Sequence, residues 1–163
     1  MVDLVILGLG SNIGDSKLNI LKAYDQIEND LGPILAKSSF YQSPPWGFKA
    51  NQDFVNSVIF IQSSHSAEQL LKLIKIIEKN MGRSPKTAEG YESRVIDIDI
   101  LDFSGVTLER DNLILPHPLM SERAFVLRPL AEILPNWIHP KSGLEIKELT
   151  DKLTDLQNIV VLK

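Results

Sequence analysis

The sequence predicts a single α+β domain, in which two helices alternate with the strands of a mainly antiparallel sheet. An apolar run at residues 2–9 suits a strand buried on both faces. Two later segments repeat apolar residues at helical spacing, and the stretch RVIDIDILDF at 94–103 alternates isoleucine with aspartate as a strand does. The 163 residues are enough for one compact domain with a sizeable core, so we expect one domain over 1–163.

The first helix is expected to begin after Asp15, which can cap it, and to end at Gly32-Pro33. Its expected buried positions are Leu18, Leu21, Tyr24, Ile27 and Leu31. Strand-like segments follow at about 34–42 and 53–62. The Pro- and Gly-containing loop SPPWGFKANQ between them is too long for a tight hairpin turn.

A second helix is expected to begin at a capping box formed by Ser66 and Gln69, and Gly82 is placed to end it. Its expected buried positions are Leu70, Leu71, Ile74, Ile77 and Met81. A polar loop leads to the aspartate strand, which Ser104-Gly105 can turn into a short hairpin.

The last third of the chain carries weaker signals. A helical stretch is expected from about Ser121, with Pro129 marking a break or a second helix start, and NIVVLK at the end as a late edge strand. The resulting order, β-α-β-β-α-β plus additions, is the plan of a ferredoxin-like sheet.

Composition excludes several classes of function. The net charge of −4 and the pI of about 5.4 argue against a broad grip on nucleic acid. With no cysteine, disulfides and cysteine-based metal sites are excluded. The apolar runs fall short of the roughly 20 residues of a membrane span, and the first residues lack a basic leader, so we expect a cytoplasmic protein without membrane partners.

The stretch GLGSNIG suggests a dinucleotide-binding loop but does not match one. Gly8, Gly10 and Gly14 make G-x-G-x-x-x-G, which is one residue too long, and the phosphate-binding G-K-[ST] sequence is absent from the chain. We therefore interpret the stretch as a tight strand-to-helix turn.

Asp97 and Asp99 are the strongest candidates for chemistry. Two residues apart on a strand, they share one face with Cα atoms roughly 6.5 Å apart, although aspartate is depleted in strands. Paired carboxylates suit Mg²⁺ ions that also bind substrate phosphates, and two such ions can clamp the attacking and leaving oxygens of phosphoryl chemistry. A solvated strand face explains the pair equally well at this point.

Cationic residues surround the aspartate strand. Arg83 and Arg94 flank an 11-residue polar loop that also contains Lys86, and guanidinium groups match phosphate oxygens. The commoner fate of a single arginine is a surface ion pair. His117 is held between prolines in LPHP, which suits contact with a phosphate or ribose, or else capping of nearby backbone.

Other residues suit a planar heterocycle. Phe54 and Asn56 fall on one strand face and combine an aromatic ring with an amide, and Phe125 can supply a second stacking face. A core phenylalanine and a backbone-bonded asparagine are the competing interpretations. Glu78 borders the stripe of the second helix, either as a rim residue or beside the same site. His65 and His139 are expected at the surface.

Together these motifs resemble the 6-hydroxymethyl-7,8-dihydropterin pyrophosphokinase family over residues 5 to about 135. The resemblance is carried, in order and spacing, by GLGSNIGD, SPPWGF, QDFVNSV, GRSPK, RVIDIDIL and LPHPLMSERAFVLRPLAEI. It implies a ferredoxin-like three-layer α-β-α sandwich. It also implies Mg²⁺-dependent transfer of pyrophosphate from ATP to the pterin's hydroxymethyl group, releasing AMP, in folate biosynthesis, by a monomer or weak homodimer.

The resemblance also assigns roles to residues. Asp97 and Asp99 would bind two Mg²⁺ ions, and Arg83 and Arg94 would act with them in catalysis, with Asp99 as the candidate proton acceptor. The implied pterin contacts are Ser43, Pro44, Trp46, Phe54, Asn56 and Phe125. The implied ATP contacts are Lys75, Glu78, Arg83, Tyr91, Arg94, Ile100, His117 and Arg123.

This chain departs from the family pattern in a few places. The loop after Arg83 is one residue longer than in the enterobacterial form. Family members often carry an extra arginine and a tryptophan in this loop, near which this chain has Gly90 and Tyr91, and Pro118 follows the LPH histidine where an aromatic is common. Phe54 replaces a tyrosine. We expect retained activity with altered ATP affinity, and closure of the loops at 43–52 and 83–93 over the substrates.

Two alternatives remain at this stage. One is another two-metal nucleotidyl transferase or cyclase on a similar sheet, which would leave Phe54, Asn56 and Phe125 without a role. The other is a non-catalytic ferredoxin-like module that binds RNA or small ligands, which predicts a basic, aromatic sheet surface.

Overall fold

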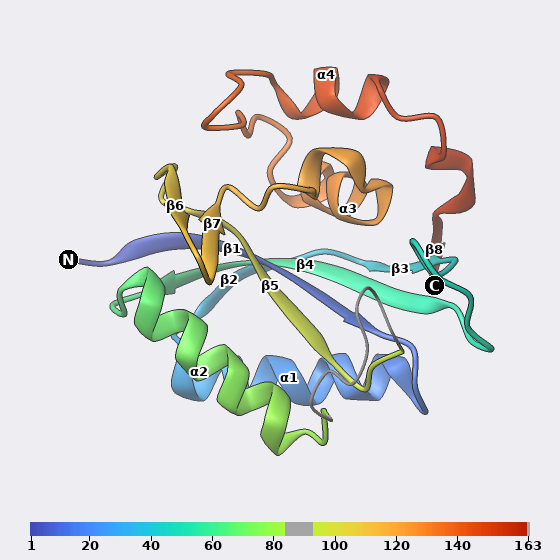
Figure 1. Cartoon of the computed structure of the whole chain (residues 1–163), viewed down its shortest axis with the longest axis horizontal. Helices are drawn as coiled ribbons and strands as arrows, with labels where there is room; N and C mark the ends of the chain where they lie inside the picture. Colours follow the sequence, from blue (N-terminus) through green and yellow to red (C-terminus); the bar gives the residue numbers. More distant parts are fainter. Residues whose placement is uncertain (84–92, 163) are drawn as a thin grey trace.

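The protein is a three-layer sandwich with a sheet between two pairs of helices. The computed structural model describes residues 1–83 and 93–162. Figure 1 shows α1 and α2 on one face of the sheet and α3 and α4 on the other. The helices are α1 (Ser16–Asp30), α2 (Ala67–Asn80), α3 (Ala124–Ile133) and α4 (Ile146–Asp151). The predicted fold class is confirmed.

The main sheet is antiparallel at every pairing in the described part of the chain. Its strands run in the order β5-β1-β4-β3-β8, and β2 also pairs with β4. They are β1 (Asp3–Ser11), β2 (Ile34–Lys37), β3 (Phe40–Ser43), β4 (Phe54–Ser63), β5 (Asp97–Phe103) and β8 (Val160–Leu162). The inner order β5-β1-β4-β3 is that of a β-α-β-β-α-β ferredoxin-like unit, and β8 confirms the expected late edge strand.

The predicted strand at 34–42 is in fact two strands, separated at Ser38. The Ser38 main chain donates to the Val58 carbonyl at 2.9 Å, and its side-chain oxygen accepts from the Val58 amide at 3.0 Å. The hydroxyl therefore takes the place of a main-chain acceptor, and regular pairing stops there.

The predicted hairpin after β5 is wrong, although its turn exists. Ser104 and Gly105 both have positive φ (49° and 70°) and reverse the chain. The strand that follows, β6 (Leu108–Arg110), pairs with β7 (Leu113–Leu115) instead of β5. Edge strand β5 pairs with β1, and Ser104 extends that contact by donating its main-chain amide to the Leu4 carbonyl at 2.8 Å.

Pro129 neither breaks a helix nor starts one, because α3 runs through it. The helix buries Val126, Leu127 and Leu130 against the sheet, and this packing outweighs the main-chain hydrogen bond that proline cannot make. A 3₁₀ turn at Met120–Glu122 precedes α3, a second lies at Leu156–Asn158, and α4 was not expected from the sequence.

The first helix begins as predicted, but its buried face differs. The Asp15 side chain accepts from the Leu18 amide at 3.1 Å. The Leu18 and Leu21 side chains are exposed (44% and 47%), so both predicted core positions are wrong. The predicted burial of Tyr24, Ile27 and Leu31 is confirmed, and Ile20 and Ala23 complete the buried stripe at spacings of three and four.

The second helix matches its prediction more closely. The capping box of Ser66 and Gln69 is present, Leu70, Ile74 and Ile77 are buried, and Leu71 and Met81 pack at the edge of the same core.

The two faces of the sheet carry different residues. Val5, Leu7 and Leu9 of β1 point toward α1 and α2 and join the larger core cluster. Ile6 points toward α3, and because side chains alternate along a strand, Gly8 and Gly10 share that face. The α3 side of the sheet therefore has room for a cavity at one end of β1.

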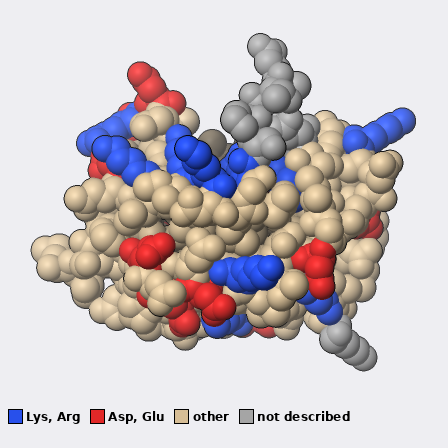
Figure 2. Space-filling view, turned by 90° about the horizontal axis from the view of Figure 1, so that it is seen from below, with Lys and Arg blue, Asp and Glu red and all other residues tan. Residues whose placement is uncertain are grey.

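The surface carries both signs of charge. The face seen from below in Figure 2 shows lysine and arginine crowded along its upper edge and mixed with aspartate and glutamate elsewhere. Within the described residues, no helix is long and apolar enough to cross a membrane.

Candidate active site

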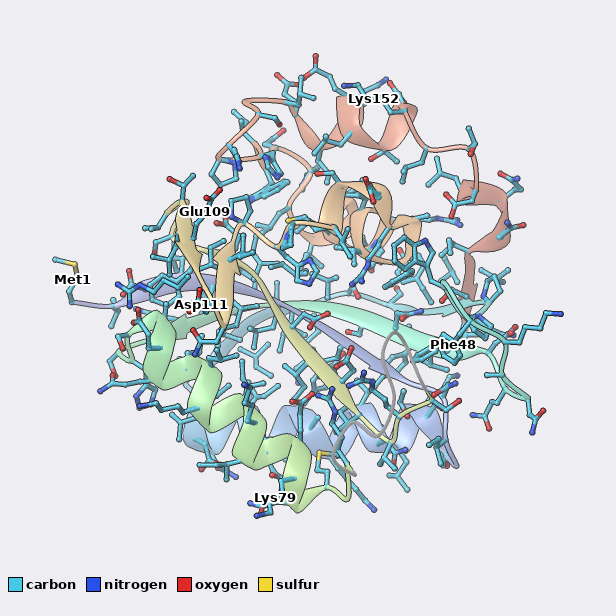
Figure 3. All side chains as sticks on the ribbon, in the orientation of Figure 1. Met1, Phe48, Lys79, Glu109, Asp111 and Lys152 are labelled. Atoms are coloured by element: carbon cyan, nitrogen blue, oxygen red, sulfur yellow. The ribbon has the colours of Figure 1, made fainter. Side chains whose placement is uncertain are left out.

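A cavity, here named the carboxylate pocket, lies between the sheet and α3. It contains Phe48, which lies at the opposite end of the molecule from Met1 and Glu109 (Figure 3). Its lining comes from β1, the end of β3, the β3–β4 loop, β4, β5, α3 and the residues just before β5 and α3: Gly8, Leu9, Gly10, Ser43, Pro44, Trp46, Phe48, Phe54, Asn56, Ser57, Val58, Arg94, Asp97, Asp99, Leu101, Arg123, Phe125 and Val126. The predicted pterin contacts are all among them.

The register of the sheet sets the two carboxylates beside β1. Gly10 pairs with Asp97 and Gly8 pairs with Asp99. Both aspartates line the carboxylate pocket, with 35% and 34% of their side-chain surfaces exposed. The shared face inferred from their spacing is therefore confirmed by the geometry.

Arginines contact both carboxylates. Arg83 and Arg94 place Nη1 atoms 3.3 Å and 3.7 Å from the Asp97 Oδ1. Arg123, from the start of α3, places its Nη1 3.7 Å from the Asp99 Oδ2. Residues far apart in the sequence thus form one alternating cluster of cations and anions, which suits a charged ligand bound through metal ions.

Burial and repulsion make this cluster unfavourable for ionised carboxylates. Burial, followed by the charge of Asp97, raises the pKa of Asp99 to about 8. Burial also raises the pKa of Asp97, although Arg83 and Arg123 oppose it. A bound cation would relieve this repulsion, so the donor set fits a hard divalent ion.

The protein supplies few metal ligands of its own. The described residues contain no group of three or more His, Cys, Asp or Glu side chains arranged to hold a metal. Mg²⁺ commonly binds through one or two carboxylates and completes its shell with water and substrate phosphates. A carboxylate pair fits that mode.

Glu78 anchors the start of the aspartate strand. Its carboxylate is 5% exposed, accepts from the Ile98 amide at 3.1 Å and pairs with Arg83. Burial, followed by the charge of Asp97, raises its pKa to about 7. Glu78 therefore lies beside the site and holds Arg83 near Asp97.

His117 combines both interpretations offered for it. Its Nδ1 accepts from the Leu119 amide at 3.2 Å, while its Nε2 lies 3.9 Å from the Asp99 Oδ2. Burial, followed by the charge of Arg123, lowers the pKa of His117 to about 4. A neutral ring that accepts at Nδ1 carries its proton on Nε2, so this atom can donate toward the carboxylate pocket.

The amide of Asn56 has a defined orientation. Its Nδ2 donates to the Ser43 Oγ at 2.7 Å and to the Tyr41 carbonyl at 3.2 Å. Both amide hydrogens are therefore used within the protein, and the Oδ1 remains to accept a hydrogen bond from a ligand. The alternative of a backbone-bonded asparagine is therefore correct for one amide hydrogen, which binds the Tyr41 carbonyl, and leaves the Oδ1 for a ligand.

Aromatic rings surround this amide. Phe48 and Phe54 pack edge to face at 6.0 Å. The Arg123 guanidinium lies 4.8 Å from the centre of the Trp46 ring and 5.5 Å from that of Phe125. Since Arg123 also contacts Asp99, it connects the aromatic part of the carboxylate pocket with the carboxylate part.

Two of the predicted ATP contacts, Arg94 and Arg123, line the carboxylate pocket. Glu78, Arg83 and His117 lie beside it through their contacts with each other and with the aspartates, whereas Lys75 and Ile100 are not among its lining residues. Lys75 is exposed on α2, and Ile100 packs into the core beneath α2, so a ligand would reach only its main chain. Tyr91 lies outside the described residues, as do Lys86 and Gly90. Separately, His139 is 9% exposed, so its expected surface position is wrong; its Nδ1 accepts main-chain amides of the turn that follows it.

Sequence reasoning missed Asn12 and the placement of the glycines. The Asn12 Oδ1 accepts from the Arg94 amide at 2.7 Å and its Nδ2 donates to Ser93 at 3.0 Å, which fixes the main chain of Arg94. The signal was present, because a polar Ser-Asn pair directly follows a buried strand. Gly8 and Gly10 lie inside β1 and line the carboxylate pocket, so their assignment to a tight turn is wrong.

Comparison with known proteins gives consistent matches. Residues 6–135 match the model of the 7,8-dihydro-6-hydroxymethylpterin-pyrophosphokinase (HPPK) family. A 2-amino-4-hydroxy-6-hydroxymethyldihydropteridine pyrophosphokinase of Aquifex aeolicus is 40% identical over 150 residues, 92% of each chain. One from Porphyromonas gingivalis is 38% identical over 141 residues, covering 85% of this chain and 95% of the relative.

Some matches are to longer proteins. The folic acid synthesis protein FOL1 of Dictyostelium discoideum is 41% identical over 157 residues, which is 96% of this chain and 23% of that protein. A solved HPPK-DHPS in complex with substrates superposes with a TM-score of 0.80 at 14% identity, over 98% of this chain and 46% of that one. At that identity the superposition shows the fold alone.

Proposed function

The chain belongs to the 7,8-dihydro-6-hydroxymethylpterin-pyrophosphokinase family, and from this premise we propose how its residues carry out the reaction. The protein is an ATP-dependent pyrophosphokinase of folate synthesis. Its reaction transfers pyrophosphate from ATP to the hydroxymethyl group of 6-hydroxymethyl-7,8-dihydropterin and releases AMP. The carboxylate pocket, with an aromatic part and a carboxylate part joined by Arg123, is the observation that carries the assignment of residues.

The pterin binds in the aromatic part of the carboxylate pocket. Phe54 and Phe125 stack on the two faces of the heterocycle, and the Asn56 Oδ1 accepts from a donor on its edge. The amide can take this role because Ser43 and the Tyr41 carbonyl hold its nitrogen. The Ser43–Trp46 segment closes the site and excludes water that would hydrolyse ATP.

Asp97 and Asp99 would hold two Mg²⁺ ions, and Mn²⁺ would satisfy the same carboxylates. When bound, the ions neutralise the polyphosphate and polarise its phosphorus–oxygen bonds. The raised carboxylate pKa values support this role, because such a pair gains most from a cation.

The basic residues position and neutralise ATP. Arg83 and Arg94 hold phosphate oxygens as the hydroxymethyl oxygen attacks the β-phosphorus and the bond to the α-phosphate oxygen breaks. His117 and Arg123 act beside Asp99, with side-chain nitrogens 3.9 Å and 3.7 Å from its Oδ2. Positioning and electrostatic stabilisation carry such a transfer, and no covalent intermediate on the protein is needed.

We also propose the wider setting of the activity. The protein acts as one domain over 1–163, as a monomer or weak homodimer in the cytoplasm, without nucleic acid or membrane partners. Lys75, Glu78, Tyr91 and the main chain of Ile100 lie along the nucleotide.

Product analysis tests this function. Incubation with ATP, Mg²⁺ and the pterin is expected to produce AMP, and to produce none when the pterin is left out. Asp97→Ala should abolish the reaction. Asp102→Asn is the matched control on the same strand, because Asp102 accepts from Trp137 and Gly105 outside the carboxylate pocket. Release of ADP or free pyrophosphate would instead favour a nucleotidyl transferase or cyclase.

A further inference from the structure

The two glycines of β1 are not explained by backbone geometry. Gly8 and Gly10 lie within a regular strand, and neither has the positive φ found at six other glycines of the described chain. Glycine in a strand interior is less stable than alanine, so something other than conformation must account for its presence there.

Gly10 lies between the two functional parts of the carboxylate pocket. In the sheet register it pairs with Asn56 on β4 and with Asp97 on β5. Directly paired residues on neighbouring strands are close enough for their side chains to interact. A side chain at position 10 would therefore stand between the amide that reads the heterocycle and the carboxylate that holds a metal ion.

A side chain at position 10 would point toward the residues proposed to bind the pterin. A methyl group at this position would lie 3.4 Å from the Asn56 Oδ1 and 3.5 Å from the Phe54 Cδ1, and its three nearest neighbours all belong to these two residues. These are ordinary van der Waals distances, so alanine fits the ligand-free protein. It would, however, cover the Asn56 oxygen.

That oxygen is the atom of Asn56 left for a ligand. Asn56 is 4% exposed, and both of its amide hydrogens bind protein acceptors. Within the described residues its Oδ1 accepts no hydrogen bond. An acceptor that faces a cavity is satisfied by water or by a donor of the ligand, and covering it without supplying a donor is unfavourable.

We propose that Gly10 is a specificity-determining residue. Because it has no side chain, the cavity wall stays open beside Asn56, and a planar heterocycle with a hydrogen-bond donor can reach the Asn56 Oδ1. This inference rests on the proposed function. It assigns to the G-x-G sequence a role in binding a planar heterocycle rather than phosphates. A substitution at position 10 should therefore change the affinity for the pterin and not the affinity for ATP.

The test compares the binding of two ligands to Gly10→Ala. Pterin affinity, measured by calorimetry, should fall about tenfold to a hundredfold, the cost of a buried acceptor left without its donor. Affinity for Mg²⁺ with a non-hydrolysable ATP analogue should stay within about twofold, because the three atoms nearest to the methyl group belong to Asn56 and Phe54 and none belongs to Asp97. The melting temperature should change little, because the gain from alanine in a strand offsets much of the cost of covering the Asn56 oxygen.

Leu4→Ala is the matched control, on the same face of β1 but at its other end, and it should leave both affinities unchanged. The proposal is overturned if Gly10→Ala binds the pterin as wild type does. It is also overturned if both ligands lose affinity equally, or if the variant does not fold, since Gly10 would then serve the fold. Failure of the wild-type protein to bind the pterin or form AMP would instead refute the proposed function.

Discussion

The two faces of β1 and β5 differ in what they contribute. On the face toward α1 and α2, Leu7, Ile98 and Ile100 are each at most 5% exposed and pack into the larger core. On the opposite face, the same strands present Gly10 and Asp97 to a cavity. One backbone, through the two-residue alternation of strand side chains, thus provides the core on one side and the reactive groups on the other.

The cavity face contributes less to stability than the core face does. Leucine and isoleucine on the core face gain free energy by burial. On the other face, glycine weakens the strand, and aspartates with raised pKa values are held close together. Substitutions on the cavity face should therefore change mainly the activity, and substitutions on the core face should change mainly the free energy of unfolding.

The largest expected effect is that of Asp97→Asn on turnover. The substitution keeps the size of the side chain but removes the charge that we propose binds a cation, so AMP formation should fall on the order of 10³-fold. In the absence of metal the melting temperature should not fall, because the repulsion between Asp97 and Asp99 is removed. A large loss of melting temperature would show that the carboxylate face also stabilises the fold.

Leu7→Ala should give the opposite result. Leu7 is 0% exposed and lies in the core cluster, so its truncation should lower the free energy of unfolding by about 3 kcal/mol. Urea denaturation measures this change. Turnover per folded molecule should remain near that of wild type, and a selective loss of pterin binding would contradict the separation of the two faces.

What the sequence predicted well follows from strict local rules. The placement of Asp97 and Asp99 on one face depends only on strand alternation, and the capping box of Ser66 and Gln69 on a spacing of three residues. The order of helices and strands also follows from such local patterns. Because the connections between them are short, this order is compatible with few topologies.

What the sequence did not predict depends on contacts between distant segments. Which stripe of α1 is buried depends on how the helix sits on the sheet, so Leu18 was mistaken for a core residue. The break at Ser38 depends on Val58, a residue of another strand. The site showed the same limit, because the role that we propose for Gly10 depends on its strand partners Asn56 and Asp97.

A smaller effect is expected where α3 holds the edge of the pterin site. Glu132 accepts from the Ser39 amide at 2.9 Å and from the Tyr41 hydroxyl, and the Tyr41 carbonyl in turn accepts from Asn56. Glu132→Gln should lower the free energy of unfolding by about 1 kcal/mol, because solvent screens this partly exposed carboxylate.

The contribution of Glu132 should depend on pH. Burial acts to raise the pKa of Glu132, but hydrogen bonds from Tyr41 and Ser39 outweigh it and lower the pKa below its usual 4.5. A lowered pKa adds stability that is present above the unfolded value and is lost as the pH falls through the folded value. The difference between wild type and Glu132→Gln, measured by urea denaturation, should therefore shrink below about pH 4.5. A constant difference would indicate that the charge is not involved.

The smallest effect tests how α1 covers the core face. The Leu18 side chain is 44% exposed, and its main-chain amide, which Asp15 caps, is unchanged by substitution. Leu18→Ala should therefore alter the free energy of unfolding by less than about 0.5 kcal/mol. Ile20→Ala, at a position that is 0% exposed two residues later, should cost about 2–4 kcal/mol. Equal costs at the two positions would contradict this division, because residues two apart on a helix cannot both face the core. The difference in unfolding free energy between Leu18→Ala and Ile20→Ala thus measures how strongly α1 is divided into a buried and an exposed face. The strands β1 and β5 show a comparable division between a core face and a cavity face.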